Sequence, residues 1–205
     1  MESLELFAGQ ATFSEVAKSN GFNPTSVDID IRSKASIVVD ILNWDYKASN
    51  IAPAVIWASP DCTRLSRAAK QSLWKKTTVK YRQYSYEAIT TESQLALTLV
   101  NKTVEIIDYF KPQVFFIENP IGRIQHLKPI KGIGHNRYFV NYAEWGFPYS
   151  KETYIFTNIM LPLPTTKQKT IAPGLRSVNN KKQRSRIPLG LLQFLFRHAC
   201  YNLNM

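Results

Sequence analysis

Cysteine is scarce in this sequence, which has only two such residues, Cys62 and Cys200, among 205. Two cysteines provide no disulfide framework, so the small disulfide-stabilised secreted scaffolds are excluded and a reducing compartment is favoured. Long hydrophobic runs are also lacking, since every apolar run is far shorter than a membrane span. The first five residues carry two acidic side chains where a signal peptide has a basic region. We therefore expect an intracellular protein, in the cytoplasm of a bacterial or host cell or in the nucleus, that is not secreted and has no membrane partner.

Acidic residues are outnumbered, with 15 Asp and Glu against 26 Lys and Arg and a formal net charge of +11. They are absent from residues 63–82 and 165–186, each of which holds seven basic residues. Elsewhere 12 basic residues face all 15 acidic ones, so the excess positive charge belongs to these two segments. This distribution favours a protein whose two basic segments bind a phosphate-rich partner from two sides. Either segment alone would also be consistent with a solvated loop. The candidate nucleic-acid-binding residues are Arg64, Arg67, Lys70, Lys75, Lys76, Lys80, Arg82, Lys181, Lys182, Arg184 and Arg186.

Short apolar segments that end in turn residues predict an α/β fold. We expect strands at residues 4–7, 25–27, 36–39, 55–58 and 114–117, and helices at 13–20, 92–110 and 188–201. The segments 138–142 and 154–157 are predicted to pair as a hairpin, which would give a mostly parallel sheet an antiparallel edge. In the helix at 92–110, apolar spacings of three and four predict a buried face made of Leu95, Leu99, Thr103, Ile106 and Phe110.

Three polar residues stand at the ends of predicted strands, where open α/β sheets place their chemistry. Asp28 follows the second strand about 20 residues after the turn at Gly9, which suits either a ribose-binding acid or a turn aspartate. Cys62 lies just beyond the strand at 55–58 and is either a nucleophile or a structural thiol. Glu118 emerges with Asn119 from the strand at 114–117, as a functional acid or as a helix cap or ion pair.

Three separated segments, in the same order, resemble motifs of the DNA cytosine-C5 methyltransferases. The first motif of that family is similar to L-E-L-F-A-G-Q-A-T-F, its catalytic Pro-Cys motif to S-P-D-C-T-R-L-S, and its Glu-Asn motif to F-I-E-N-P. The segment W-G-F-P-Y-S-K-E-T-Y-I-F stands where the family has Gly-x-Pro-Gln-x-Arg-x-Arg. The tail, residues 184–188 with the helix that follows, is similar to C-terminal segments of small phage- or virus-type members. Agreement in order and spacing across residues 3–158 makes the resemblance more specific than any single motif.

The resemblance implies a Rossmann-like fold that uses S-adenosyl-L-methionine, with S-adenosyl-L-homocysteine as product, and double-stranded DNA as partner, with no metal. It implies that Cys62 attacks C6 of a cytosine flipped out of the duplex, and that Glu118 contacts or protonates N3. Asn119 would hold Glu118 and the cysteine loop in register, and Lys151 would contact the cytosine O2 or that loop. Arg64 or the lysines after it would lower the pKa of Cys62. The expected domains are a catalytic domain at 1–160, a small basic target-recognition segment at 161–186 and a C-terminal helical segment at 187–205.

The same resemblance implies which residues hold the cofactor. The loop after the first strand would line its methionine and ribose side, and Asp28 with Ile29 would take the ribose hydroxyls. Asp40 and Ile41 would flank the adenine, and Pro60 would form a wall between cofactor and cytosine. The loop residues concerned are Phe7, Ala8, Gly9 and Ala11.

Several residues depart from the family pattern. Asp61 replaces the second proline of a Pro-Pro-Cys run and places a like charge beside the thiolate, which tends to raise the pKa of Cys62. Ala11 replaces a loop glycine, Pro120 replaces a valine, and Tyr149, Lys151 and Thr153 replace Gln, Arg and Arg. Two alternatives therefore stay open beside a DNA enzyme: an RNA (tRNA) cytosine-C5 methyltransferase, and a catalytically idle protein that binds nucleic acid or the cofactor. The short segment 165–186 predicts a short or relaxed recognition sequence.

Overall fold

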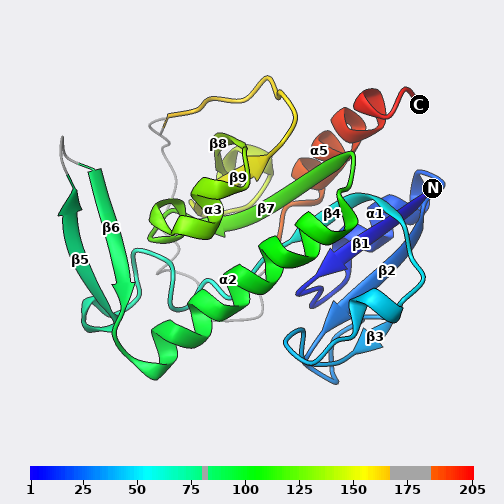
Figure 1. The fold of residues 1–205 in the computed structure, drawn as a ribbon. Coiled ribbons are helices and arrows are strands. Elements are labelled where there is room, and N and C mark those ends of the chain that lie inside the picture. Colours follow the sequence, from blue (N-terminus) through cyan, green and yellow to red (C-terminus); the bar gives the residue numbers. More distant parts are fainter. Residues whose placement is uncertain (80–82, 167–185) are drawn as a thin grey trace.

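The computed structural model describes residues 1–79, 83–166 and 186–205, and its centre is a seven-stranded β-sheet (Figure 1). The strand order is β3-β2-β1-β4-β7-β9-β8, in which the first five strands are parallel and the last two are antiparallel to their neighbours. The mostly parallel sheet with an antiparallel edge hairpin is therefore confirmed. The strands are β1 (Glu2–Leu6), β2 (Asn23–Asp28), β3 (Ile37–Val38), β4 (Pro53–Ala58), β7 (Val114–Pro120), β8 (Asn136–Asn141) and β9 (Glu152–Thr157).

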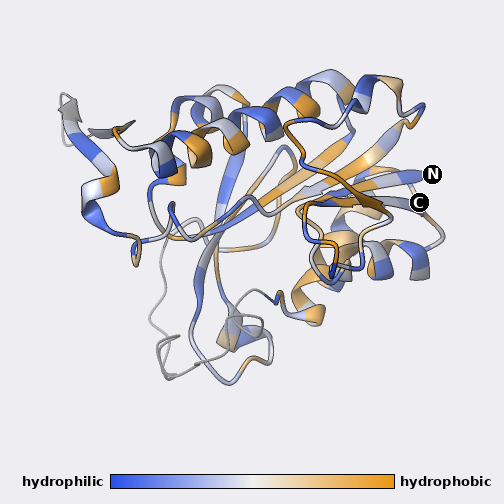
Figure 2. Ribbon diagram, turned by 90° about the horizontal axis from the view of Figure 1, so that it is seen from below, coloured by the Kyte–Doolittle hydropathy of each residue, from blue (hydrophilic) through white to orange (hydrophobic). Residues whose placement is uncertain are grey.

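Helices cover both faces of the sheet because its central strands are apolar on both sides. In β4, Val55 and Trp57 point into one core cluster, whereas Ile56 and Ala58 point into the other. The first cluster lies under α1 (Thr12–Ser19) and α5 (Leu189–Asn202), and the second under α2 (Thr91–Phe110) and α3 (Lys128–Gly132). The central strands are accordingly among the most hydrophobic parts of the ribbon (Figure 2). Short 3-10 helices complete the described fold: η1 (Tyr46–Ala48), η2 (Gln71–Leu73), η3 (Ile124–His126) and η4 (Tyr142–Trp145).

The buried face of α2 differs from the predicted one. The helix is capped as its sequence suggests, since Thr90 and Ser93 form a reciprocal capping box. Leu95, however, is 42% exposed, and the buried face is made of Ser93, Ala96, Val100, Thr103, Ile106 and Ile107. Residues 95–100 are almost uniformly apolar, so the spacing alone does not fix which side faces the sheet.

A two-stranded hairpin, β5 (Trp74–Val79) with β6 (Gln83–Ala88), stands apart from the main sheet after the cysteine loop (Figure 1). The sequence analysis gives no strands here and describes this region only as part of the basic segment at residues 63–82. Trp74 anchors the hairpin, because it is 5% exposed and its indole Nε1 donates to the carbonyl of Arg64 over 2.9 Å. Two basic residues of the first basic segment, Lys75 and Lys76, are therefore carried on a defined strand.

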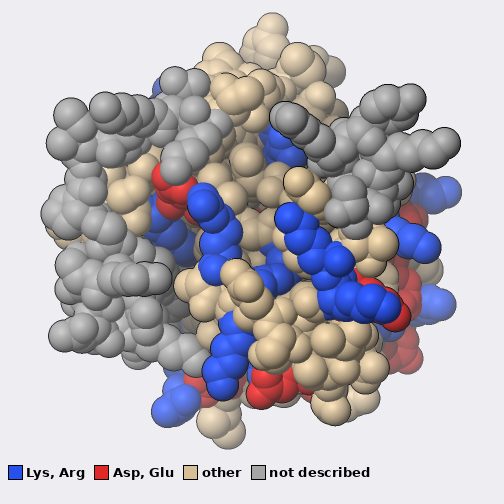
Figure 3. All heavy atoms as spheres, turned by 90° about the vertical axis from the view of Figure 1, so that its left-hand side faces the viewer, with Lys and Arg blue, Asp and Glu red and all other residues tan. Residues whose placement is uncertain are grey.

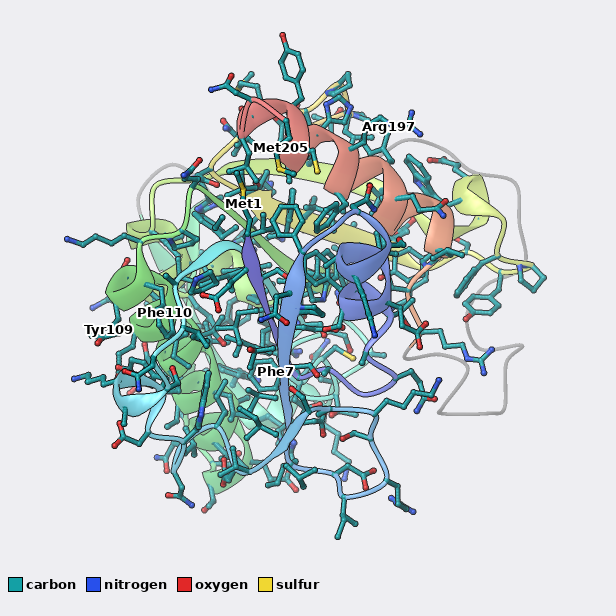
Figure 4. The ribbon with its side chains drawn as sticks, turned by 90° about the vertical axis from the view of Figure 1, so that its right-hand side faces the viewer. Met1, Phe7, Tyr109, Phe110, Arg197 and Met205 are labelled. Atoms are coloured by element: carbon teal, nitrogen blue, oxygen red, sulfur yellow. The ribbon has the colours of Figure 1, made fainter. Side chains whose placement is uncertain are left out.

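The C-terminal helix α5 packs against α1 through its apolar face, as its spacing predicts. The two chain ends, Met1 and Met205, lie on the same side of the molecule (Figure 4). Most of the segment at 161–186 lies outside the described residues, so the division into three domains stays a prediction. Within the described ranges, no helix is long and apolar enough to cross a membrane.

Candidate active site

The predicted site residues of β1, β2, β4 and β7 gather where these parallel strands end. β1 lies between β2 and β4, at the point where the strand order reverses, and such a switch point opens a crevice for ligands. Phe7 lies at the end of β1 opposite to Met1 (Figure 4). Its carbonyl accepts a hydrogen bond from the Ser59 hydroxyl over 3.4 Å, which joins the loops after β1 and β4.

The loop after β1 is tightly bent and is tied to β2. Phe7, Gly9 and Ala11 all adopt left-handed backbone conformations, with φ of 60°, 52° and 54°. Ala11 thus takes a conformation that favours glycine, in agreement with the residue that the family pattern has there. The Gly9 amide donates to Asp28 Oδ2 over 2.8 Å, and the Ala8 amide donates to the Val27 carbonyl over 3.1 Å.

The remaining predicted cofactor residues have different surroundings. Asp40 follows Val39, whose amide donates to the Asp28 carbonyl over 2.9 Å. Ile41 is 5% exposed and belongs to the hydrophobic core, whereas the side chain of Ile29 is 68% exposed. The structure therefore brings the loop, Asp28 and the segment before Asp40 together, and it points Ile29 toward solvent.

Glu5 is a buried acid of this region that the sequence analysis overlooks. Its carboxylate caps the start of α1, accepting from the Ser14 amide over 2.8 Å, the Ser14 hydroxyl over 2.7 Å and the Phe13 amide over 3.3 Å. The side chain is 3% exposed, and this burial raises the pKa of Glu5 to about 7, against the hydrogen bonds that lower it. The only sequence signal is an acid between two leucines of a strand, followed at a distance by a helix start.

Replacing Glu5 by glutamine is expected to stabilise the fold at high pH and to change little near pH 4.5. The folded pKa of about 7 lies above the unfolded value of 4.5, so the wild type loses stability as the pH rises through that interval. The variant cannot ionise, and its advantage in free energy of unfolding should grow to about 3 kcal/mol by pH 8. Urea unfolding at pH 4.5 and pH 8 measures this, with the exposed Glu15→Gln in α1 as control. A difference in free energy of unfolding between Glu5→Gln and the wild type that does not change with pH would contradict the raised pKa of Glu5.

The cysteine loop is held by the strand that carries the candidate acid. The Asn119 amide Nδ2 donates to the carbonyl of Pro60 over 2.8 Å, and Asn119 itself is fully buried in β7. Beyond Cys62, the amides of Leu65 and Ser66 both donate to the Cys62 carbonyl, which closes a turn. This geometry supports the predicted function of Asn119 in keeping the two segments in register.

Glu118 is 4% exposed and has two donors on one oxygen, Oε1. The Lys151 ammonium lies 3.5 Å from it, and the Tyr142 hydroxyl donates to it over 2.7 Å. The Lys151 nitrogen also lies 4.5 Å from the centre of the Tyr142 ring. The ion pair satisfies a carboxylate that would otherwise be costly to bury. Tyr142 is the second residue of this region that the sequence analysis does not find.

The half-buried thiol of Cys62 lies within the electrostatic influence of this pair. Burial raises the pKa of Cys62, the Lys151 charge lowers it, and the carboxylates of Glu118 and Asp61 raise it further. The cation beside the thiol is therefore Lys151. Arg64, which the sequence also suggested for this function, forms an ion pair with Asp61 instead.

A second set of contacts fixes the chain after Cys62 to the chain after β7. The Arg123 amide donates to the Leu65 carbonyl over 2.7 Å, and its guanidinium Nη1 donates to the Ser66 carbonyl over 2.9 Å. Between them, Gly122 forms an isolated β-bridge with Ser66. The end of β7 and the segment after it are thus bonded to the chain both before Cys62, at Pro60, and after it, at Leu65 and Ser66.

Sequence comparison assigns this arrangement to a family, although no family model matches the chain. Over 178 residues, the chain is 31% identical to the "Probable DNA (cytosine-5)-methyltransferase" of Frog virus 3 (isolate Goorha), covering 81% of this chain and 74% of the relative. The chain belongs to the DNA cytosine-5 methyltransferase family. The resemblance drawn from the three motifs is confirmed.

Solved structures agree with this family in their fold. One is a "putative DNA modification methyltransferase" encoded within a prophage (E. coli), with a TM-score of 0.53 and 16% identity over 84% of this chain. Another is the Entamoeba histolytica methyltransferase EhMeth, with a TM-score of 0.54 and 14% identity over 82% of this chain. The chain spans about half the length of these structures, 52% and 57%. The predicted Rossmann-like methyltransferase fold is confirmed.

The departure of this chain from the family motif at Asp61 has a structural counterpart. Asp61 accepts from the Thr63 amide over 2.9 Å and pairs with Arg64, and these contacts hold its pKa below its ordinary value. It is therefore ionised at neutral pH beside Cys62. Asp61 also lines a pocket of about 590 Å³, together with Thr63, Arg64, Ala68, Ala69, Lys70, Leu73 and Glu92.

Replacing Asp61 by asparagine is expected to make Cys62 more reactive. Removal of the neighbouring negative charge lowers the pKa of the thiol, and asparagine can still accept from the Thr63 amide. Alkylation by iodoacetamide at pH 7.5 should become about threefold faster, which corresponds to about half a pKa unit. The measurement uses a Cys200→Ser background so that the signal reports Cys62 alone. An unchanged or slower rate would show that the Asp61 charge does not reach the thiol.

The predicted nucleic-acid-binding residues are described only in part. Arg67, Lys70, Lys75 and Lys76 are exposed, and Arg186 is exposed at the start of the C-terminal segment. Lys80, Arg82, Lys181, Lys182 and Arg184 lie outside the described residues. On the side of the molecule where the β5–β6 hairpin projects, Lys and Arg side chains cross the middle of the face, and an acidic group lies directly beside them (Figure 3). No group of three metal-binding side chains occurs among the residues that the structure describes.

Proposed function

We propose that this protein transfers a methyl group from S-adenosyl-L-methionine to C5 of a cytosine in DNA through a covalent bond between Cys62 and C6. The observation that carries the proposal is the buried ion pair of Glu118 and Lys151 at the carboxyl end of β7, which the hydrogen bond from Asn119 to the Pro60 carbonyl joins to the loop of Cys62. Membership of the DNA cytosine-5 methyltransferase family supports it. Such a reaction places the protein inside the cell, where its DNA substrate is.

Cys62 begins the reaction as a nucleophile. Cytosine C5 is a poor nucleophile until a thiolate adds to C6, because the new S–C6 bond breaks the aromaticity of the ring and moves its electron pair toward C5 and N3. Glu118 would contact or protonate N3 and so offset the charge that develops there. When C5 has taken the methyl group, loss of its proton to a base and departure of the Cys62 thiolate restore the ring.

Lys151 and Asn119 would set the charge and the position of Cys62 and Glu118. The Lys151 charge favours the thiolate of Cys62 and neutralises the buried Glu118 carboxylate. Asn119 would fix the position of the cysteine loop relative to β7 through its hydrogen bond to the Pro60 carbonyl. Lysine lacks the planar fork of arginine, so its contact with a base oxygen would be a single hydrogen bond.

The cofactor residues fit S-adenosyl-L-methionine, which supplies an electrophilic methyl group when bound. Asp28 ends β2 beside the Gly9 amide, at the switch point where a ribose-binding acid is expected. Phe7, Ala8, Gly9 and Ala11 would line the methionine and ribose side. Asp40 and Ile41 would flank the adenine, with Ile29 next to Asp28, and Pro60 would separate the cofactor from the cytosine.

The basic residues would hold double-stranded DNA through its phosphates, and the target base must leave the stack to reach Cys62. Arg67, Lys70, Lys75 and Lys76 are exposed on the segment that follows the cysteine loop. The segment at 161–186 would bind phosphates from the other side of the DNA and would contact the bases of the target sequence. We expect a short or relaxed target sequence, because a segment of this length can contact few base edges.

The test is transfer of labelled methyl groups from S-adenosyl-L-methionine to duplex DNA and, in parallel, to a transfer RNA. We expect label in DNA, recovered as 5-methylcytosine, and sequencing of the product gives the target. Label in RNA alone would replace DNA by RNA as the substrate. Binding of cofactor and DNA without label in either would make the protein an idle binder.

A further inference from the structure

A buried tyrosine, Tyr142, forms a hydrogen bond with the candidate acid, Glu118. Tyr142 begins η4, is completely buried, and donates its hydroxyl hydrogen to Glu118 Oε1 over 2.7 Å. Its backbone amide donates to the Lys151 carbonyl over 3.2 Å, and the Lys151 amide donates to the Asn141 side-chain oxygen over 3.2 Å. The two donors to Glu118 are therefore held to one another by the backbone.

The phenol remains a donor throughout the working pH range. Burial raises the pKa of Tyr142 well above its ordinary value, and the charges of Glu118 and of the Cys62 thiolate raise it further.

Tyr142 contacts a position where this chain departs from its family. Lys151 stands where the family pattern has an arginine, and its nitrogen lies 4.5 Å from the centre of the Tyr142 ring. A lysine ammonium on a flexible chain fixes a carboxylate less firmly than a planar guanidinium does. A second donor on the same oxygen restores that constraint, because the ring of Tyr142 is locked in the core beside Phe147.

We propose that Tyr142 is a positioning residue that holds Glu118 Oε1 and thereby directs the other carboxylate oxygen, Oε2, to N3 of the cytosine. This inference rests on the proposed function, in which Glu118 meets N3. Tyr142 itself does not touch the base. Its hydrogen bond fixes the plane of the carboxylate before the base arrives, so that the contact to N3 needs no reorganisation when charge develops there.

The test compares Tyr142→Phe with the matched variant Tyr138→Phe in steady-state methyl transfer to DNA. Tyr138 is also buried in the core cluster of Tyr142, but its hydroxyl accepts from the Leu161 amide and is not bonded to Glu118. Tyr142→Phe should lower kcat about 10- to 100-fold, the range for loss of a hydrogen bond to a charged group, with KM for DNA unchanged. Tyr138→Phe should leave kcat within about twofold of the wild type.

A double-mutant cycle separates positioning from a general structural effect. In a Glu118→Gln background, Tyr142→Phe should cost much less in kcat than it does in the wild type, because the two residues act through one contact. Equal losses in both backgrounds, or equal losses for Tyr142→Phe and Tyr138→Phe, would overturn the inference. A wild type without methyl transfer to any nucleic acid would instead overturn the proposed function, so the two failures are distinguishable.

Discussion

Cys62→Ser is expected to lower methyl transfer to DNA by a factor of at least about 1,000, while the protein keeps its fold and its affinity for S-adenosyl-L-methionine. A serine hydroxyl ionises at far higher pH than a thiol and is a harder, weaker nucleophile toward C6 of a pyrimidine. The half-buried Cys62 side chain differs from serine by one atom, so the loop that Asn119 holds should not move. The loss of rate would therefore report chemistry.

The measurement is incorporation of labelled methyl groups into duplex DNA under single-turnover conditions, with calorimetric binding of the cofactor in parallel. Cys200→Ser is the matched control. The second cysteine lies in α5, packs against the core cluster under α1 and α5, and is not one of the candidate site residues. The Cys200→Ser variant should transfer methyl groups at the wild-type rate. A Cys62→Ser variant that retains activity within tenfold of the wild type would rule out the covalent mechanism.

Much of the fold follows from local sequence patterns. β4 and β7 contain apolar runs that are followed by turn residues, β1 alternates leucine with polar residues, and their order with the intervening helices specifies a mostly parallel sheet. The β5–β6 hairpin could not be predicted in the same way. Its strands are largely polar, and the residues that anchor it, Trp74, Tyr86 and Ala88, pack against parts of the chain that only folding brings near.

The candidate site shows the same division between local and distant signals. Cys62, Glu118 and Asn119 each lie within a motif that follows a predicted strand, so their gathering at one edge of the sheet follows from the topology. Tyr142 and Glu5 carry no such signal, because each acts through a partner that folding brings near. Tyr142 is 24 residues from Glu118 and on a different element, and Glu5 reaches Ser14 only after β1 and α1 have packed.

Gly122 illustrates how packing after β7 controls the geometry around Cys62. A Cβ atom at this position would lie 2.1 Å from the Leu65 carbonyl oxygen and 2.7 Å from the Ser66 Cα, and both are backbone atoms. No side-chain rotation can relieve such contacts, so the segment after the cysteine loop would have to move. A shift of about 1 Å in a catalytic arrangement can lower the rate about 100-fold.

Gly122→Ala is therefore expected to reduce methyl transfer at least about 100-fold, a loss that reflects displacement of Leu65 and Ser66 and with them the turn that begins at the Cys62 carbonyl. Gly132→Ala in α3 is the matched control, because a Cβ there meets no atom within 4 Å and should leave the rate unchanged. Thermal unfolding of both variants, with cofactor binding, identifies the folded fraction to which the rate refers. Full activity of folded Gly122→Ala would show that the loop can move away from Gly122 without disturbing Cys62. A rate loss without loss of cofactor binding would show that the distance between the cysteine loop and the chain after Glu118, rather than the crevice at β1 and β2, limits the reaction.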